Sequence, residues 1–172
     1  MKNMPKRWKL INSIMFGAII GLSAYIFIQS NALSYLSDDP KTCINCHVMN
    51  SYYSSWAHSS NRRFTNCNEC HVPHNNIVSK FLFKAQDGLR HATVFTLRTE
   101  PQVIYILEAG RKVVQENCIR CHYQNISNTS LVNATNAHIG NDKEQVCWRC
   151  HRELPHRRVN SLSSAPNAIL NN

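Results

Sequence analysis

Four copies of one short cysteine motif constrain the fold of this 172-residue chain more than any other feature. Each copy reads Cys-x-x-Cys-His, and together the copies use all 8 cysteines. The motif is typical of covalent attachment of a c-type haem, because the two thiols bond to the porphyrin and the adjacent His can reach the iron. The sequence therefore predicts four haems, attached through Cys43, Cys46, Cys67, Cys70, Cys118, Cys121, Cys147 and Cys150.

Two other uses of paired cysteines compete with the haem interpretation. Zinc sites are also built from Cys-x-x-Cys pairs, but they do not require a His directly after every pair. An even number of cysteines in a secreted chain can also indicate a disulfide framework. The His that follows all four pairs favours haem over both alternatives.

Four haems leave little protein for a conventional core. Apart from the N-terminal stretch, about 140 residues remain to surround them. We therefore expect the haems to supply most of the apolar interior, with short helices and loops attached to them. The predicted fold is mostly α with much irregular structure and little or no sheet.

The chain is basic, with 19 Lys and Arg against 10 Asp and Glu and a formal net charge of +9. Such an excess can indicate nucleic-acid binding or an anionic membrane surface. Here the two propionates of each haem would largely cancel it. Since the sequence contains no nucleic-acid recognition motif, we expect no nucleic-acid partner.

A basic tail followed by an apolar run opens the chain. The run covers residues 10–28 without a charged side chain, and as a helix it would rise about 28 Å, close to the ~30 Å hydrocarbon thickness. Positive charges before the run orient the N-terminus to the cytoplasm and the haem region to the bacterial periplasm. The alternative is a cleaved signal peptide, because Ser30-Asn31-Ala32 fits a cleavage site. The positive charges are Lys2, Lys6, Arg7 and Lys9.

These features divide the chain into four predicted regions. They are a basic cytoplasmic tail over residues 1–9, a single transmembrane anchor in the inner membrane over 10–29, a periplasmic tetrahaem domain over 30–157, and a polar tail over 158–172.

The haem region contains an internal duplication. Eight residues separate His58 from Cys67, and eight separate His138 from Cys147. Each of these units follows another haem motif, and each ends in Pro-His. We therefore expect two duplicated dihaem halves in a compact domain, over residues 43–75 and 118–157, joined by 76–117.

A six-coordinate haem needs two axial ligands, and the histidines supply candidates. His71, His122 and His151 follow the second cysteine of their motifs and are expected to bind iron on one face. The expected distal ligands are His58, His138 and His156, with His74 and His91 as further candidates. In the first motif Met49 stands two residues after His47, and a thioether ligand raises haem potential relative to two histidines. Spacing leaves open whether Met49 or His47 binds that haem.

The linking segment predicts a helix over residues 76–97 and a second amphipathic helix over 102–116. On the first helix Lys80, Lys84 and Asp87 fall at i, i+4 and i+7 and share one face. One interpretation is a solvated face with salt bridges. The other is an interfacial helix that presents a Lys and an Asp to a haem. Quinol oxidation releases protons, so a carboxylate beside a lysine that binds the quinol oxygen suits the second interpretation.

The ensemble resembles the NapC/NirT family of membrane-anchored multihaem quinol dehydrogenases. The resemblance rests on the basic tail, the single span, Cys-Ile-Asn-Cys-His-Val-Met, Cys-Asn-Glu-Cys-His-Val-Pro and two further haem motifs, from Met1 to about His156. The compact length is most similar to the small subunit of a cytochrome c nitrite reductase. The resemblance implies that electrons from menaquinol pass through four haems to a separate catalytic multihaem subunit. That subunit would reduce nitrite to ammonium in respiration. A periplasmic nitrate or N-oxide reductase is the alternative acceptor.

The resemblance also implies roles for single residues. Met49 would replace His47 as the ligand of the first haem, Asp87 would lie over the open face of that haem, and Lys80 would lie in the quinol pocket. A lysine of the reductase partner would bind the second haem. The sequence contains no Cys-x-x-Cys-Lys, the motif of the family's nitrite-reducing haem, so a separate chain is expected to reduce nitrite. A soluble tetrahaem carrier and a self-contained reductase with an open haem are the other classes that fit the motifs.

Overall fold

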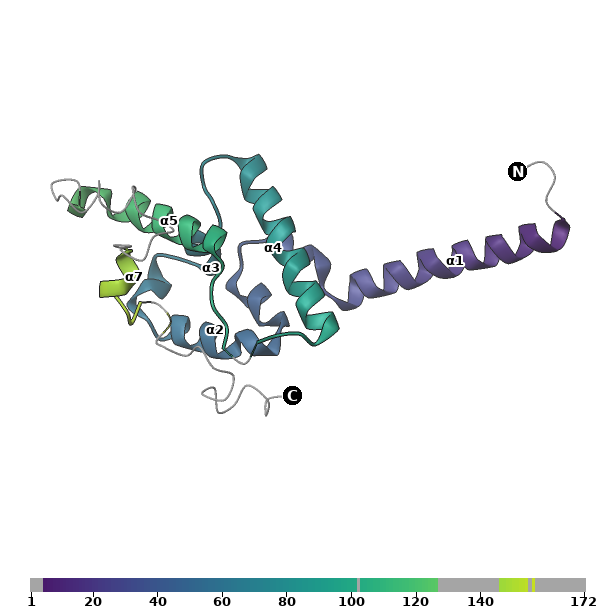
Figure 1. Ribbon diagram of the computed structural model, residues 1–172, viewed down its shortest axis with the longest axis horizontal. Helices are drawn as coiled ribbons and strands as arrows, with labels where there is room; N and C mark the ends of the chain where they lie inside the picture. Colours follow the sequence, from purple (N-terminus) through teal and green to yellow (C-terminus); the bar gives the residue numbers. More distant parts are fainter. Residues whose placement is uncertain (1–4, 102, 127–145, 155, 157–172) are drawn as a thin grey trace. The chain divides into compact units, whose positions relative to one another are not determined.

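The computed structural model describes residues 5–101, 103–126, 146–154 and 156. These residues form helices and short 3₁₀ turns, and no strand is formed among them (Figure 1). The mostly α fold predicted from the motifs is therefore confirmed. The helices are α1 (Lys6–Gln29), α2 (Asn50–Ala57), α3 (Cys67–His71), α4 (Ile77–Leu97), α5 (Glu108–Ile126) and α7 (Cys147–Cys150), and the 3₁₀ turns are Ala32–Leu36, Pro40–Asn45, His47–Met49 and Ser60–Arg63.

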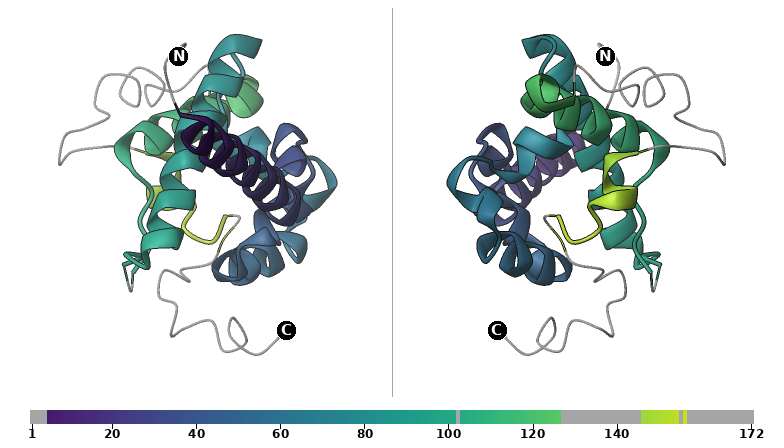
Figure 2. Two further views of the ribbon diagram at one scale, coloured as in Figure 1. Left: turned by 90° about the vertical axis from the view of Figure 1, so that its right-hand side faces the viewer. Right: turned by 90° about the vertical axis from the view of Figure 1, so that its left-hand side faces the viewer.

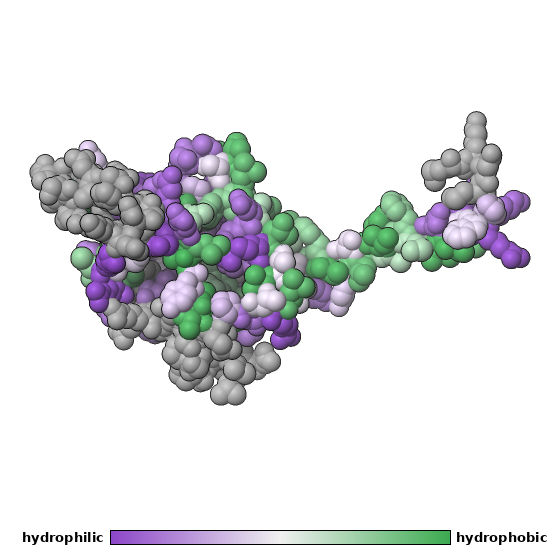
Figure 3. Space-filling model, in the orientation of Figure 1, coloured by the Kyte–Doolittle hydropathy of each residue, from purple (hydrophilic) through white to green (hydrophobic). Residues whose placement is uncertain are grey.

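The chain divides into two units, the first ending at Ser37 and the second beginning at Asp38. In the first unit, α1 is the one described helix that is long and apolar enough to cross a membrane. None of its side chains is buried, and apolar side chains cover most of its length (Figure 3). A helix that is apolar on all sides is stable in lipid, where its side chains need no protein partner. The predicted apolar helix is confirmed.

In the second unit the four haem motifs lie on short helical elements. The first motif spans two 3₁₀ turns, the second forms α3, the third lies inside α5, and the fourth forms α7 and the residue that follows it. Local capping explains where two helices begin. The side chain of Asn66 accepts a hydrogen bond from the backbone N–H of Glu69 at 3.0 Å, and that of Asn76 accepts one from Ser79 at 2.7 Å.

The first helix of the linking segment agrees with the prediction, and the second does not. α4 covers Ile77–Leu97 and ends at Arg98, whose φ of 54° is the left-handed conformation common after helices. α5 begins at Glu108 rather than at residue 102, and it continues through the third haem motif to Ile126 rather than ending at 116. The β-branched and aromatic residues Val103 to Tyr105 lose side-chain freedom in a helix, which explains the later start.

Few side chains form the core of the second unit. Among the described residues, the buried apolar side chains are Trp56, Val72, Val113 and Val146, and two polar side chains of α5, Gln115 and Asn117, are also buried. α3 packs against α5, and α7 lies beside α5 (Figures 1 and 2). α5 is therefore the element around which the second, third and fourth motifs are arranged.

Candidate functional site

The cysteine pairs have the geometry of haem attachment sites. In α3, α5 and α7 the two thiols of each motif are three residues apart on one helix, so they lie on the same side. None of the eight cysteines takes part in a disulfide. Nor do three or more His, Cys, Asp or Glu side chains of the described residues converge on a point that could hold a metal ion. Among the described residues, the arrangement of the thiols is thus that of neither a disulfide nor a closed zinc site.

The motifs meet in pairs. The side chain of Cys43 is in hydrogen-bonding contact with that of Cys67, and the side chain of Cys118 is in contact with that of Cys147. Burial, together with the neighbouring thiol, raises the pKa of Cys118 to about 12. The first motif thus lies next to the second and the third next to the fourth, as two dihaem halves would require. The duplication itself stays a prediction, since most of the second half lies outside the described residues.

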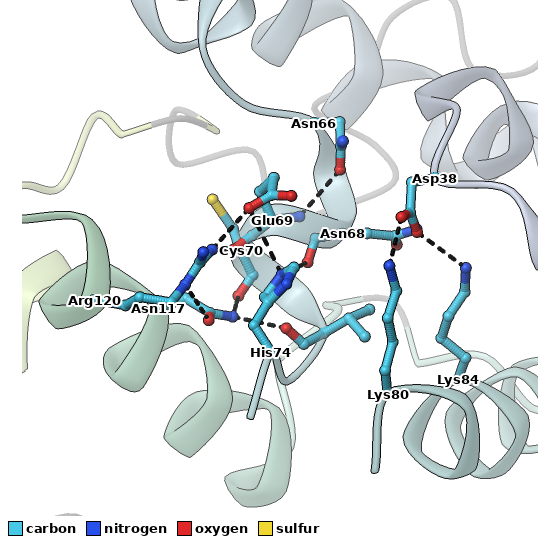
Figure 4. Close-up of polar contacts among 11 residues, drawn as sticks. Asp38, Asn66, Asn68, Glu69, Cys70, His74, Lys80, Lys84, Asn117 and Arg120 are labelled. Atoms are coloured by element: carbon cyan, nitrogen blue, oxygen red, sulfur yellow. Dashed lines mark hydrogen bonds and ion pairs between the residues drawn. The ribbon is translucent and has the colours of Figure 1, made fainter. Parts of the chain in front are cut away.

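Two buried amides of α5 hold the other motifs in place. The Nδ2 of Asn117 donates to the carbonyl oxygens of Cys70, at 3.0 Å, and Val72, at 2.8 Å (Figure 4). The Oε1 of Gln115, whose side chain is fully buried, accepts a hydrogen bond from the backbone N–H of Cys147 at 3.0 Å. One helix thereby fixes the backbone of the second and fourth motifs relative to the third.

An ion pair supports the same junction at the protein surface. The guanidinium of Arg120, inside the third motif, lies 2.7 Å from the carboxylate of Glu69, inside the second (Figure 4). The same Glu69 carboxylate is 3.7 Å from His74 Nε2. Because these groups are partly exposed, the pairs add little stability alone, and the buried amides define the junction.

Two buried hydrogen-bond donors also fit a bound haem. The Nε1 of Trp56 and the Nε2 of Gln115 are buried donors without a hydrogen-bond partner. A buried donor left unsatisfied costs about 1–3 kcal/mol, and such groups in proteins normally meet an acceptor. Haem propionates are acceptors of the required kind. Together with the thiols and the small side-chain core, these donors fit an interior that is completed by haem.

His71 and His156 lie together. Their ring centroids are 6.0 Å apart, and the Nδ1 of His156 is 3.2 Å from the carbonyl oxygen of Tyr52. Burial and the neighbouring His156 lower the pKa of His71 to about 4, and burial also lowers the pKa of His156. A lowered pKa favours the neutral imidazole, which is the form that binds a metal. The structure brings together one expected proximal ligand and one expected distal ligand.

The other candidate ligands differ in exposure and in the groups that they contact. Met49 is half-buried where a 3₁₀ turn meets α2, whereas His47 is exposed and its ring lies edge-on to Phe95 at 6.4 Å. His58 is exposed, and its Nδ1 is 2.7 Å from the carbonyl oxygen of Ser54. His122 and His151 are exposed, and His138 lies outside the described residues.

His74 and His91, the two further candidates, also contact neighbours in the sequence. The Nε2 of His74 is 3.2 Å from the carbonyl oxygen of Asn68. The Nδ1 of His91 is 3.3 Å from a carboxylate oxygen of Asp87. Both contacts fall within a few residues along the chain, so neither ring is directed by a distant element.

A charge cluster, formed by Asp38, Lys80 and Lys84, joins α4 to the start of the second unit. The Nζ of Lys80 is 2.5 Å from Asp38 Oδ2, and the Nζ of Lys84 is 3.3 Å from Asp38 Oδ1 (Figure 4). Asn68, inside the second haem motif, donates to the same Oδ1 at 2.7 Å. Burial raises the pKa of Asp38, but the three donors outweigh it and hold that pKa at about 2.

The shared face predicted for Lys80 and Lys84 is thus correct, but their carboxylate partner was not foreseen. The sequence contained a signal for it. Asp38 and Asp39 form an acidic pair between the apolar run and the first motif, in a chain with few acidic residues. Nothing in local spacing connects Asp38 to lysines more than forty residues later.

Asp87 has different partners from those of Lys80. Its carboxylate is 3.4 Å from Arg90 Nε and 3.3 Å from His91 Nδ1, one turn further along α4. Asp87 also acts on His71, because its negative charge opposes the burial that lowers the pKa of that imidazole. α4 therefore directs two ammonium groups toward Asp38 and carries a carboxylate whose charge is felt by the histidine of the second motif.

The sequence matches the description "NapC/NirT cytochrome c family, N-terminal region" over residues 3–161. The chain belongs to this family. As a cytochrome c it carries covalently bound c-type haem, and the resemblance expected from the motifs is confirmed.

Two known proteins are similar over nearly the whole length. The cytochrome c-type protein NrfH of Wolinella succinogenes is 47% identical over 160 residues, which cover 91% of this chain and 90% of that protein. A chain in a crystal structure of the cytochrome c nitrite reductase NrfHA complex bound to the HQNO inhibitor matches with a TM-score of 0.62 and 28% identity. That match covers 88% of this chain and 94% of the other.

Proposed function

We propose that this chain is the membrane-anchored subunit of a cytochrome c nitrite reductase. It oxidises menaquinol at the inner membrane and passes electrons through four c-type haems to a separate catalytic subunit in the periplasm. The observation that carries the proposal is the 47% identity to NrfH over 91% of the chain. α1 is the single anchor, with the N-terminus in the cytoplasm. The alternative acceptor, a periplasmic nitrate or N-oxide reductase, is supported by family membership alone.

The cysteines of the four motifs hold the haems, and the histidines bind the irons. His71, His122 and His151 act as proximal ligands and Met49 serves the first motif. His58, His138 and His156 supply distal ligands, and His156 lies next to a haem-binding segment, with its ring 6.0 Å from that of His71. The bound haems would take up and release electrons one at a time.

α4 supplies the groups for the quinol. The ammonium of Lys80 donates a hydrogen bond to a quinol oxygen, and the carboxylate of Asp87 accepts a quinol proton. Oxidation of menaquinol to menaquinone releases two protons and two electrons, so Asp87 must also lose the protons it receives. The Asp87 side chain is 42% exposed and can therefore release them to water.

The identity of the acceptor is tested by purification of the native complex. The chain, tagged at its C-terminus, is solubilised gently from native membranes, and the proteins that co-purify are identified. We expect a multihaem nitrite reductase in a stable complex, with nitrite reduced to ammonium when menadiol is the electron donor. A molybdenum reductase in its place would favour the alternative acceptor.

A further inference from the structure

The charge cluster Asp38–Lys80–Lys84 joins α4 to a residue more than forty positions earlier in the chain. The Lys80 and Lys84 side chains are 22% and 14% exposed, so both side chains are largely packed against the protein. Three donors, from Lys80, Lys84 and Asn68, converge on the two oxygens of Asp38 (Figure 4). A long, flexible lysine side chain held in this way loses the freedom that would otherwise oppose precise placement of its charge.

The cluster contains two ammonium groups and one carboxylate. Asp38 itself stays ionised, because its donors stabilise the carboxylate, and it is therefore unsuited to accept protons. What the cluster offers a ligand is an ammonium donor at a fixed position, from which an oxygen of the bound quinol can accept a hydrogen bond.

The cluster is also connected to the haem region. Asn68 lies between the two cysteines of the second motif, and its Nδ2 donates to Asp38 at 2.7 Å. The carboxylate that holds the lysines of α4 is thus hydrogen-bonded to a haem-binding segment. A change at Asp38 would alter the position of Lys80 relative to that segment.

We infer that Asp38 is a positioning residue for quinol oxidation, which holds the ammonium of Lys80 at the place where a quinol oxygen binds. The inference rests on the proposed function. Asp38 acts through Lys80 and does not itself touch the quinol. Lys84 shares the carboxylate of Asp38 with Lys80.

The test uses the complete complex in membranes, with menadiol as the donor and nitrite as the acceptor. Asp38→Asn keeps the size of the side chain but removes the charge that holds Lys80. We expect the KM for menadiol to rise about tenfold, with kcat changed less than twofold, as for loss of uniform binding. Nitrite reduction driven by reduced methyl viologen, which bypasses the quinol, stays unchanged. A variant that merely misfolds in part would instead lower kcat and leave KM as it was.

Three further variants define the role. Asp39→Asn removes the same charge from the neighbouring residue, which caps its own turn through the N–H of Lys41 at 2.9 Å, and should leave KM unchanged. Asp38→Glu restores the carboxylate and should bring KM within about threefold of the wild type. In a Lys80→Met background, Asp38→Asn should have almost no additional effect on KM, because residues that act through one contact are not additive.

The outcomes separate this inference from the proposed function. If the wild-type complex does not oxidise menadiol, the proposed function fails, and the role of Asp38 fails with it. If the wild type is active and Asp38→Asn has a normal KM, only the inference about Asp38 is overturned. It is also overturned if Asp39→Asn raises KM equally, or if Asp38→Asn raises KM to the same extent with and without Lys80.

Discussion

The side-chain amide of Asn117 donates a hydrogen bond to the backbone carbonyl of Cys70 at 3.0 Å. This contact joins the second haem motif to the helix that carries the third. Since the same amide also binds the carbonyl of Val72, a single side chain satisfies two acceptors at the end of α3. The spacing between two haem-binding segments therefore depends on one buried asparagine.

Asn117→Ala is expected to lower the stability of the haem-loaded protein by about 2–3 kcal/mol, because it leaves two carbonyl groups without their donor. Thermal unfolding followed by circular dichroism measures the change. Asn125→Ala, on the exposed side of the same helix, is the matched control and should stay within about 0.5 kcal/mol of the wild type. Equal unfolding curves for the two variants would show that the amide does not hold the junction.

The stabilising effect of Asp38 is expected to disappear in acid. Its pKa is about 2 in the folded protein, below the ordinary value of 3.8, so its contribution is present above pH 3.8 and is lost as the pH falls toward 2. The midpoint temperatures of the wild type and Asp38→Asn should therefore differ by a constant amount from pH 5 to 7 and converge near pH 2. A difference that persists at the lowest pH would contradict this assignment.

His156→Ala is expected to convert one haem from low spin to high spin, because the iron loses a strong nitrogen ligand. Electron paramagnetic resonance of the oxidised full-length protein detects the change, and added imidazole should reverse it. His74→Ala is the control, because His74 is not among the ligands in the proposed function. An unchanged spectrum for His156→Ala would remove His156 from the ligand set.

The mature protein is expected to keep α1. Its intact mass should correspond to a chain that begins at Met1 and carries four haems, and alkaline washing should leave it in the membrane fraction. A chain that begins at Leu33 would instead support the cleaved signal peptide.

Loss of one haem from the variant in which Cys147 and Cys150 are both serine would confirm that α7 is an attachment site.

Local patterns in the sequence predicted local structure well. The haem motifs need only adjacent residues, and α4 shows both its periodicity and its asparagine cap, so both could be read directly. The start of α5 could not be placed, because Pro101 is a common helix signal and the unfavourable residues after it delay the helix. Contacts such as that of Asp38 with Lys80 depend on how distant segments fold together, so the spacing of residues in the sequence does not predict them.

Reduction of the haems by a quinol tests the central claim most directly. The full-length complex in membranes is mixed with menadiol, and haem reduction is followed by visible absorption. We expect rapid reduction, at a rate that Lys80→Met and Asp87→Asn lower at least tenfold. We also expect nitrite to reoxidise the haems in the presence of the catalytic partner. Haems that dithionite reduces but menadiol does not would contradict the account.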